Sequence, residues 1–208
     1  MCPVCPDALL IDFGGVLTSD VLEAFDAFCL AAGLPPGAVP TLLREDADAG
    51  RQFVAFEEGR VAEWAFEQSL AASLGNRHEV EIEPAGLVAR LTATLRPDRS
   101  TIDAVHRVRA AGVPVAIVSN SFGYGAYDGY DLVGLADSII ISGEVGARKP
   151  SRRIYRQAAA CLRVATERCM FIDDLEINLA GAKRLGMRVF HHRDGDATAA
   201  FLEQVFAL

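Results

Sequence analysis

The sequence predicts an α/β fold, in which helices cover both faces of a parallel sheet and an all-helical segment is inserted into that core. Two observations lead to this fold class. Short apolar segments alternate with amphipathic helical patterns through the second half of the chain, and this alternation is typical of parallel sheets. Between the first apolar segment and the second, a stretch of roughly 75 residues shows helical patterns alone.

Five short apolar segments are predicted to form buried strands, because each is a nearly continuous hydrophobic run. In chain order they span residues 8–11, 113–118, 138–141, 169–172 and 187–190. Helical patterns that accompany the later strands span residues 101–111, 152–162 and 178–185. Gly112 and Gly186 directly follow the first and the last of these helices, and glycine is a common helix stop signal.

The segment from residue 19 to residue 95 breaks the alternation of strands and helices. Turn-forming clusters at residues 33–37 and 74–76 divide it. Four helices are predicted there, at residues 21–32, 39–50, 60–74 and 82–95. We therefore predict an α/β core of residues 1–18 and 96–208 with a helical cap of residues 19–95. The cap leaves the core just after the first strand, at the edge where ligands bind in open parallel sheets.

The composition indicates a folded protein that does not bind nucleic acid. Hydrophobic residues make up 51% of the chain, and the net charge is −8. Nucleic acids and anionic membranes attract basic surfaces, so we expect neither as a partner. A small phosphorylated metabolite needs only local positive charge and stays compatible. The sequence shows no membrane span and no secretory signal, so we expect a cytoplasmic protein. It leaves open whether the chain forms a homodimer.

The five cysteines do not form a disulfide framework, since their number is odd and their spacing irregular. Cys2 and Cys5 make a C-x-x-C motif at the amino terminus, without a second pair. A structural zinc ion usually takes four protein ligands. We therefore expect reduced thiols there.

Polar side chains follow four of the predicted strands, at the point where each strand ends. Because the carboxyl ends of parallel strands meet at one edge of a sheet, these groups are expected to converge. They are Asp12 with Gly14 and Gly15, Ser119 with Asn120, Lys149 with Pro150, and Asp173 with Asp174, followed by Asn178.

This combination of groups can assemble a magnesium and phosphate site. Mg²⁺ prefers hard oxygen ligands, typically one or two carboxylates with water and substrate phosphate. Lys149 can neutralise phosphoryl charge, and Ser119 and Asn120 can donate hydrogen bonds to its oxygens. Asp12 is the candidate nucleophile that forms an aspartyl-phosphate. Two glycines beyond it let the backbone approach metal and phosphate closely.

The order of these motifs resembles the haloacid dehalogenase superfamily of phosphatases. The resemblance covers nearly the whole chain, with the helical cap between the first and second motifs. The stretches EVGARKPSRRIY and FIDDLEINLAGAKRLGM are most similar to the branch that contains the amino-terminal phosphatase domain of soluble epoxide hydrolase and certain bacterial sugar-phosphate phosphatases. The resemblance implies a Rossmann-like core and a Mg²⁺-dependent hydrolase of a small phosphomonoester.

The resemblance also implies a role for each motif residue. It implies that two carboxylates and one backbone carbonyl ligate the metal, that a hydroxyl, an amide and a lysine bind phosphate, and that two further side chains support the ligands. The ligands are Asp12, which is also the nucleophile, Asp174 and the carbonyl of Gly14; the phosphate-binding residues are Ser119, Asn120 and Lys149, with Lys149 also catalytic; the supporting residues are Asp173 and Asn178.

One position departs from the pattern of the family. Its phosphatases usually carry a second aspartate two residues after the nucleophile, which protonates the leaving group and later activates water. Gly14 stands at that position here. A phosphomutase is therefore not expected, because it depends on that acid/base. Two alternatives to the phosphatase stay open: a 2-haloacid dehalogenase-type hydrolase, which needs no metal, and a catalytically impaired binding or regulatory protein of the same fold.

Three further motifs have less defined expectations. Residues 122–130 hold three tyrosines among glycines and form either a wall of the substrate pocket or a surface loop. The pair His191-His192 lacks the carboxylate spacing of a metal site. Residues 194–196, Asp-Gly-Asp, are expected to form a turn.

Overall fold

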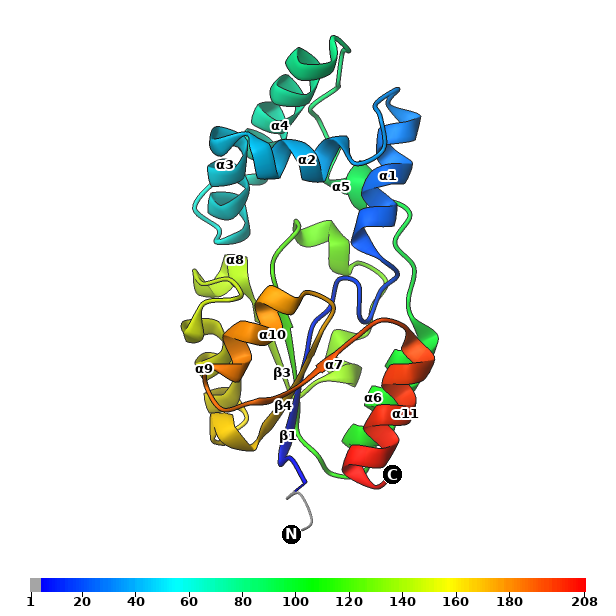
Figure 1. The fold of residues 1–208 in the computed structure, drawn as a ribbon, viewed down its shortest axis with the longest axis vertical. Helices are drawn as coiled ribbons and strands as arrows, with labels where there is room; N and C mark the ends of the chain where they lie inside the picture. The colour runs from blue at the N-terminus through cyan, green and yellow to red at the C-terminus, as the bar shows by residue number, and fades with distance from the viewer. Residues whose placement is uncertain (1–4) are drawn as a thin grey trace.

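The computed structural model describes residues 5–208 and confirms the predicted α/β fold class. Figure 1 shows a sheet flanked by helices at one end of the molecule and a group of helices at the other end. Cys5 is an exposed free cysteine. Cys2, the other half of the C-x-x-C motif, lies outside the described residues.

Five parallel strands form one sheet in the order β3-β2-β1-β4-β5. All five predicted strands are present, shifted by at most two residues at either end. The first strand in the chain, β1, lies at the centre of the sheet, so the carboxyl ends of β2 and β4 lie on either side of its own. The strands span Ala8–Ile11 (β1), Val115–Ser119 (β2), Ser138–Ile141 (β3), Cys169–Asp173 (β4) and Arg188–His191 (β5).

Helices cover both faces of the sheet because successive strand residues point to opposite faces. Leu9 and Ile11 of β1 pack in one apolar cluster with Val105, whereas Leu10 packs in another with Ile154. The first cluster lies under α6 (Arg99–Ala110) and α11 (Gly195–Phe206), and the second under α9 (Arg152–Cys161) and α10 (Glu176–Lys183). Two single-turn helices, α7 (Leu132–Leu135) and α8 (Ser142–Val145), flank β3.

The helical region contains five helices and its own aromatic core. Phe25, Phe56, Phe66 and Leu70 are among its buried residues, and the rings of Phe56 and Phe66 stack at a centroid distance of 4.4 Å. These helices lie beyond the carboxyl ends of the strands (Figure 1). They are α1 (Val21–Ala31), α2 (Ala38–Glu45), α3 (Ala47–Glu57), α4 (Glu63–His78) and α5 (Leu87–Thr92).

The prediction of a single helix at residues 39–50 was wrong, because α2 ends at Glu45 and α3 begins at Ala47. Asp46 adopts an extended conformation and its carboxylate accepts hydrogen bonds from the N–H groups of Asp48 and Ala49. An aspartate that caps a helix in this way starts a new helix rather than continuing the old one.

Residues 194–196, predicted to form a turn, instead begin the helix α11. Asp194 caps α11 by accepting a hydrogen bond from the N–H of Ala197, and α11 packs against α6. The polar residues that favoured a turn are thus the start of a helix that the sequence analysis missed.

Two chain segments connect the helical region to the sheet, and they lie side by side. Thr18 and Pro97 form an antiparallel bridge. Ser19 N–H donates to the carbonyl of Arg96 at 2.7 Å, and Arg96 N–H donates to the Ser19 hydroxyl at 3.1 Å. The helical region therefore leaves and re-enters the core at one place.

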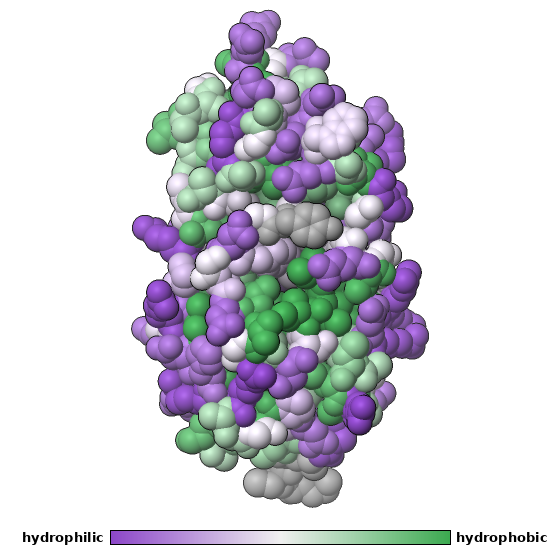
Figure 2. Space-filling view, turned by 180° about the vertical axis from the view of Figure 1, so that it is seen from behind, coloured by the Kyte–Doolittle hydropathy of each residue, from purple (hydrophilic) through white to green (hydrophobic). Residues whose placement is uncertain are grey.

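The surface is mostly polar on the face shown in Figure 2, where an apolar area gathers at mid-height. Within residues 5–208, no helix combines the length and the apolar character that crossing a membrane requires.

Candidate active site

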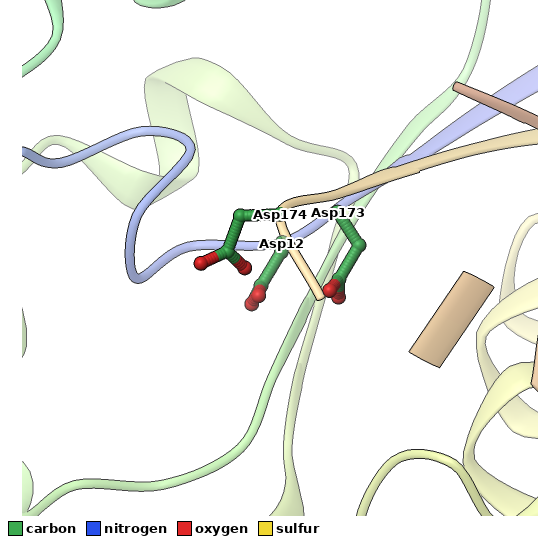
Figure 3. Close-up of side chains that lie close together, drawn as sticks. All are labelled: Asp12, Asp173 and Asp174. Carbon is green, nitrogen blue, oxygen red and sulfur yellow. The ribbon is translucent and has the colours of Figure 1, made fainter. Parts of the chain in front are cut away.

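Three carboxylates meet at the carboxyl ends of the adjacent strands β1 and β4. Asp12 directly follows β1, Asp173 is the last residue of β4, and Asp174 comes next. One carboxylate oxygen from each lies within 4.8 Å of the others, and Figure 3 shows the three side chains together. The pairing of β1 with β4 holds this arrangement, because Asp12 N–H also donates to the carbonyl of Ile172 at 2.9 Å.

Lys149 lies inside this group of carboxylates. Its Nζ is 2.5 Å from Asp12 Oδ1 and 2.8 Å from Asp173 Oδ2, and only 1% of the residue is exposed. Asn120 holds the backbone of Lys149 from both sides: Oδ1 accepts from the Lys149 N–H at 2.8 Å, and Nδ2 donates to the Lys149 carbonyl at 3.2 Å. The side chain of Asn120 thus fixes the lysine in place.

Asp173 and Asp174 have different surroundings although they are neighbours in the chain. Besides Lys149, Asp173 accepts hydrogen bonds from Asn178 Nδ2 on both oxygens, at 3.0 and 3.2 Å, and from Leu175 N–H at 2.8 Å. Asp174 faces the loop after Asp12 instead. A Cβ atom on Gly15 would lie 2.7 Å from Asp174 Oδ2, and Gly15 has a φ of +75°. A side chain at position 15 would therefore be strained and would displace Asp174.

The loop after Asp12 supplies a carboxylate but no second acid. Phe13 N–H donates to Asp12 Oδ1 at 2.6 Å, and the Phe13 carbonyl accepts from the N–H groups of Leu17 and Thr18. The carbonyl of Gly14 takes no part in these bonds that close the turn. Asp20, the next carboxylate along the chain, caps α1 through the Leu22 N–H at 2.6 Å.

The negative charges of the three carboxylates exceed the single positive charge of Lys149. Burial, together with the nearby carboxylates of Asp173 and Asp174, raises the pKa of Asp12, although Lys149 opposes the rise. Burial and the charge of Asp173 raise the pKa of Asp174 to about 6. Three carboxylates face one ammonium group, so a cation bound among them would relieve their repulsion.

Ser119 ends β2 close to the same edge and is 2% exposed. Its hydroxyl donates to the carbonyl of Asn120 at 3.2 Å, and it lies 2.9 Å from the hydroxyl of Tyr127. The structure therefore places every residue predicted for the site at the carboxyl edge of the sheet, with Lys149 between the carboxylates.

A family model described as haloacid dehalogenase-like hydrolase matches residues 6–186. The chain belongs to this family. The match includes β1 to β4 and the whole helical region, so all the residues of the carboxylate group and Lys149 lie within it.

Several known proteins are similar to this hydrolase. A phosphatase of Mycobacterium tuberculosis (strain CDC 1551 / Oshkosh) is 39% identical over 56 residues, which are 27% of this chain and only 26% of the phosphatase. The structure of a haloacid dehalogenase family enzyme from Bacteroides thetaiotaomicron, in complex with magnesium and inorganic phosphate, is 17% identical with a TM-score of 0.63, and the alignment covers 91% of this chain and 96% of that chain. A dehalogenase structure is 23% identical with a TM-score of 0.68, over 91% of this chain and 85% of that chain. Both structural likenesses establish the fold alone.

The hydrolase also has an ion pair near the site that the sequence analysis missed. Glu57 ends α3 in the helical region and is 5% exposed, and its Oε2 lies 2.5 Å from Nε of Arg148, the residue before Lys149. The contact is an ion pair, and neither Glu57 Oε2 nor Arg148 Nε has a hydrogen-bond partner within residues 5–208. Burial raises the pKa of Glu57 to about 7, against the effect of Arg148. The adjacent Glu58 has the same side chain, so no local signal distinguishes the two.

Two residues on other elements complete the surroundings of the site. His191, at the end of β5, lies with Nε2 2.8 Å from the carbonyl of Asp174, whereas His192 pairs with Thr198 of α11. The histidines therefore point to different partners and do not form a joint metal site in the described part of the chain.

In residues 122–130, Tyr127 and Tyr130 pack against Phe13.

Proposed function

We propose that this hydrolase is a Mg²⁺-dependent phosphatase that acts on a small phosphomonoester through a phosphorylated Asp12. The observation that carries the proposal is the convergence of three carboxylates around the buried Lys149 at the sheet edge. A carboxylate nucleophile, oxygen ligands and one buried cation are the groups that phosphoryl transfer requires.

The donor set fits Mg²⁺. The ligands we propose are the carboxylates of Asp12 and Asp174 and the backbone carbonyl of Gly14, all hard oxygens. Asp173 is proposed to hold Lys149 rather than the metal, since Lys149, Asn178 and Leu175 already bind its oxygens. Bound Mg²⁺ would neutralise part of the carboxylate charge and polarise the phosphoryl oxygens.

The residues of the chain supply the remaining chemistry. An oxygen of Asp12 attacks phosphorus, the bond from phosphorus to the ester oxygen breaks, and its electron pair stays on the departing alkoxide. Water then attacks the phosphorus of the aspartyl-phosphate and the bond from phosphorus to the Asp12 oxygen breaks, which releases inorganic phosphate and restores Asp12. The alkoxide takes a proton from solvent, and the proton that the attacking water loses returns to solvent. Lys149 balances the charge of the phosphoryl group, and Ser119 donates to one of its oxygens. Asn120 contributes to phosphate binding in two ways: it holds the backbone of Lys149, and its second amide hydrogen can donate to a phosphoryl oxygen.

A dehalogenase is the first alternative, since a dehalogenase shares the fold and the chemistry also uses an aspartate nucleophile. That reaction needs no metal. A second carboxylate, Asp174, lies beside Asp12 and suits a metal site, which argues against the dehalogenase. A binding protein that has lost turnover is the second alternative, and Gly14 at the place of the usual acid/base favours it.

One experiment separates the three functions. Purified protein is incubated with a panel of phosphorylated metabolites and aryl phosphates, with Mg²⁺ and with EDTA, and with 2-haloacids in parallel. We expect phosphate release with Mg²⁺ that stops with EDTA. Halide release that survives EDTA would establish the dehalogenase, and the absence of either product would favour the binding protein.

A further inference from the structure

The tyrosine-containing loop of residues 122–130 joins the helical region to the nucleophile loop. At its start, the ring of Phe122 lies 5.1 Å from that of Phe25 and 5.8 Å from that of Phe53, within the aromatic core of the helical region. Further along, the rings of Tyr127 and Tyr130 each lie 4.8 Å from Phe13, the residue after the nucleophile. The loop is thus held at both ends by ring contacts.

Tyr127 and Tyr130 make the same ring contact but differ in their hydroxyl groups. The hydroxyl of Tyr127 lies 2.9 Å from Ser119 Oγ. The hydroxyl of Tyr130 is buried and has no hydrogen-bond partner among residues 5–208. Only Tyr127 therefore connects the loop to a proposed phosphate-binding residue.

The hydroxyl groups of Tyr127 and Ser119 can each donate or accept, and the other contact of Ser119 favours one direction. The Ser119 hydroxyl has one proton, so in the arrangement in which it donates to the Asn120 carbonyl at 3.2 Å, Tyr127 is the donor and Ser119 Oγ the acceptor. Burial raises the pKa of Tyr127 to about 12, and the phenol keeps its proton at neutral pH. When Ser119 turns its proton to a phosphate oxygen, it can still accept from Tyr127. Hydrogen bonds in such a chain strengthen one another.

We propose that Tyr127 is a positioning residue for phosphate binding: its hydroxyl orients the Ser119 hydroxyl and makes it a stronger donor to a phosphoryl oxygen. The proposal rests on the proposed function, in which Ser119 binds the phosphate. It adds a residue from outside the four sequence motifs and gives the tyrosine-containing loop a role in the site.

The test compares Tyr127→Phe with Tyr130→Phe, which removes a hydroxyl from the same loop while the same ring contact stays. The affinity for inorganic phosphate is measured by calorimetry in the presence of Mg²⁺, together with kcat/KM for an aryl phosphate and the melting temperature. We expect Tyr127→Phe to lower phosphate affinity and kcat/KM by about 3- to 10-fold, the worth of one neutral hydrogen bond. Tyr130→Phe is expected to stay within about twofold of wild type.

A double-mutant cycle shows whether Tyr127 acts through Ser119. In a Ser119→Ala background, Tyr127→Phe should cause less than a further twofold loss of phosphate affinity. An additive loss, or a Tyr127→Phe protein with the phosphate affinity of Tyr130→Phe, would overturn the proposal and leave the phosphatase intact. Wild-type protein that binds phosphate without hydrolysing esters would refute the phosphatase, while the calorimetric cycle would still decide the role of Tyr127. Wild-type protein that binds no phosphate would overturn both.

Discussion

The sheet edge and the helical region bury different kinds of side chain. At the sheet edge, Asp12 and Asp173 are buried and both contact the buried Lys149. In the helical region, the core is built mainly of phenylalanine and leucine. The buried carboxylate of Glu57 forms its ion pair with Arg148, a residue of the α/β core. Burying several charges together costs free energy, which is consistent with a catalytic role for the sheet edge, whereas the helical region is stabilised by apolar packing.

The contrast implies that the two regions respond differently to substitution. Changes at the edge should remove turnover or metal binding, and changes in the helical region or at its contact with the core should alter stability or preference among substrates. We propose that the helical region acts as a lid, which would exclude water and contribute specificity while the reacting groups lie at the sheet edge.

The largest effect is expected for Asp12→Asn. Because Asp12 is the proposed nucleophile and also a proposed ligand, phosphate release should fall by at least about 10³-fold. Asp7→Asn is the matched control, since Asp7 precedes the other end of β1 and is exposed. Steady-state assays of both variants, with circular dichroism to verify folding, check this. Near-normal turnover by Asp12→Asn would remove the basis for the nucleophile.

A distinction between neighbouring carboxylates is the next effect in size. Asp174→Asn should weaken Mg²⁺ binding by more than about 100-fold, and Asp173→Asn by about tenfold, because Asp173 is held by Lys149 and Asn178. Asp173→Asn should instead cost more stability, as it leaves Lys149 with one carboxylate fewer. Calorimetric titration of Mg²⁺ and thermal melts measure both quantities. Equal Mg²⁺ affinities would refute the distinction.

Much of the sheet edge could be predicted from the sequence because parallel strands impose it. A strand buried on both faces is a continuous apolar run, and the residues after such runs meet at one edge. This reasoning predicts that Asp12, Lys149 and Asp173 lie together, and the structure brings them together.

The contacts between regions could not be predicted because their partners are far apart in sequence and locally unremarkable. Nothing near Glu57 marks it rather than Glu58 as the partner of Arg148. Tyr127 was noted as part of an unusual loop, but only the fold shows that its hydroxyl reaches Ser119. The residues at the start of α11 predict a turn because aspartate favours turns as well as helix caps.

A smaller effect on turnover is expected for Gly14→Asp, which returns a carboxylate to the acid/base position. General acid–base help is worth about 10²–10⁴-fold. Without it, the wild type should prefer phosphates with good leaving groups, such as anomeric, enol, phenol or acyl phosphates, over those of primary alcohols. Gly14→Asp should raise turnover of primary alkyl phosphates by at least about tenfold and flatten the preference.

The matched control is Gly14→Asn, which has nearly the same shape and no acidic proton. Both variants meet the same obstacle, because a Cβ at position 14 would lie 3.1 Å from Val21 Cγ2. A plot of turnover against leaving-group pKa compares the proteins. If wild type shows no dependence and Gly14→Asp is no faster than Gly14→Asn, another residue supplies the proton.

The smallest effect on turnover is expected for Glu57→Gln, whose consequence is a changed pH dependence of stability. Burial raises the pKa of Glu57 from its ordinary value of 4.5 to about 7. Between these values the folded protein holds a proton that the unfolded chain has released, so the Glu57 contribution to the free energy of unfolding falls as pH rises through this range. The difference between Glu57→Gln and wild type should shift in favour of the variant by roughly 2–3 kcal/mol from pH 4.5 to pH 8. Urea unfolding at several pH values measures it. Glu58→Gln is the control, since Glu58 is the neighbouring carboxylate and is less buried. A difference that does not vary with pH would show that Glu57 keeps its ordinary pKa.

Phosphoryl transfer to Asp12 is tested most directly by rapid acid quench of enzyme mixed with Mg²⁺ and excess aryl phosphate, followed by peptide mass spectrometry over a series of quench times. We predict that the peptide containing Asp12 gains one phosphoryl group, and that the gain disappears with EDTA and in Asp12→Asn. A phosphoryl group on a different peptide, or product formation with no phosphorylated peptide at any quench time, would contradict a mechanism that passes through Asp12.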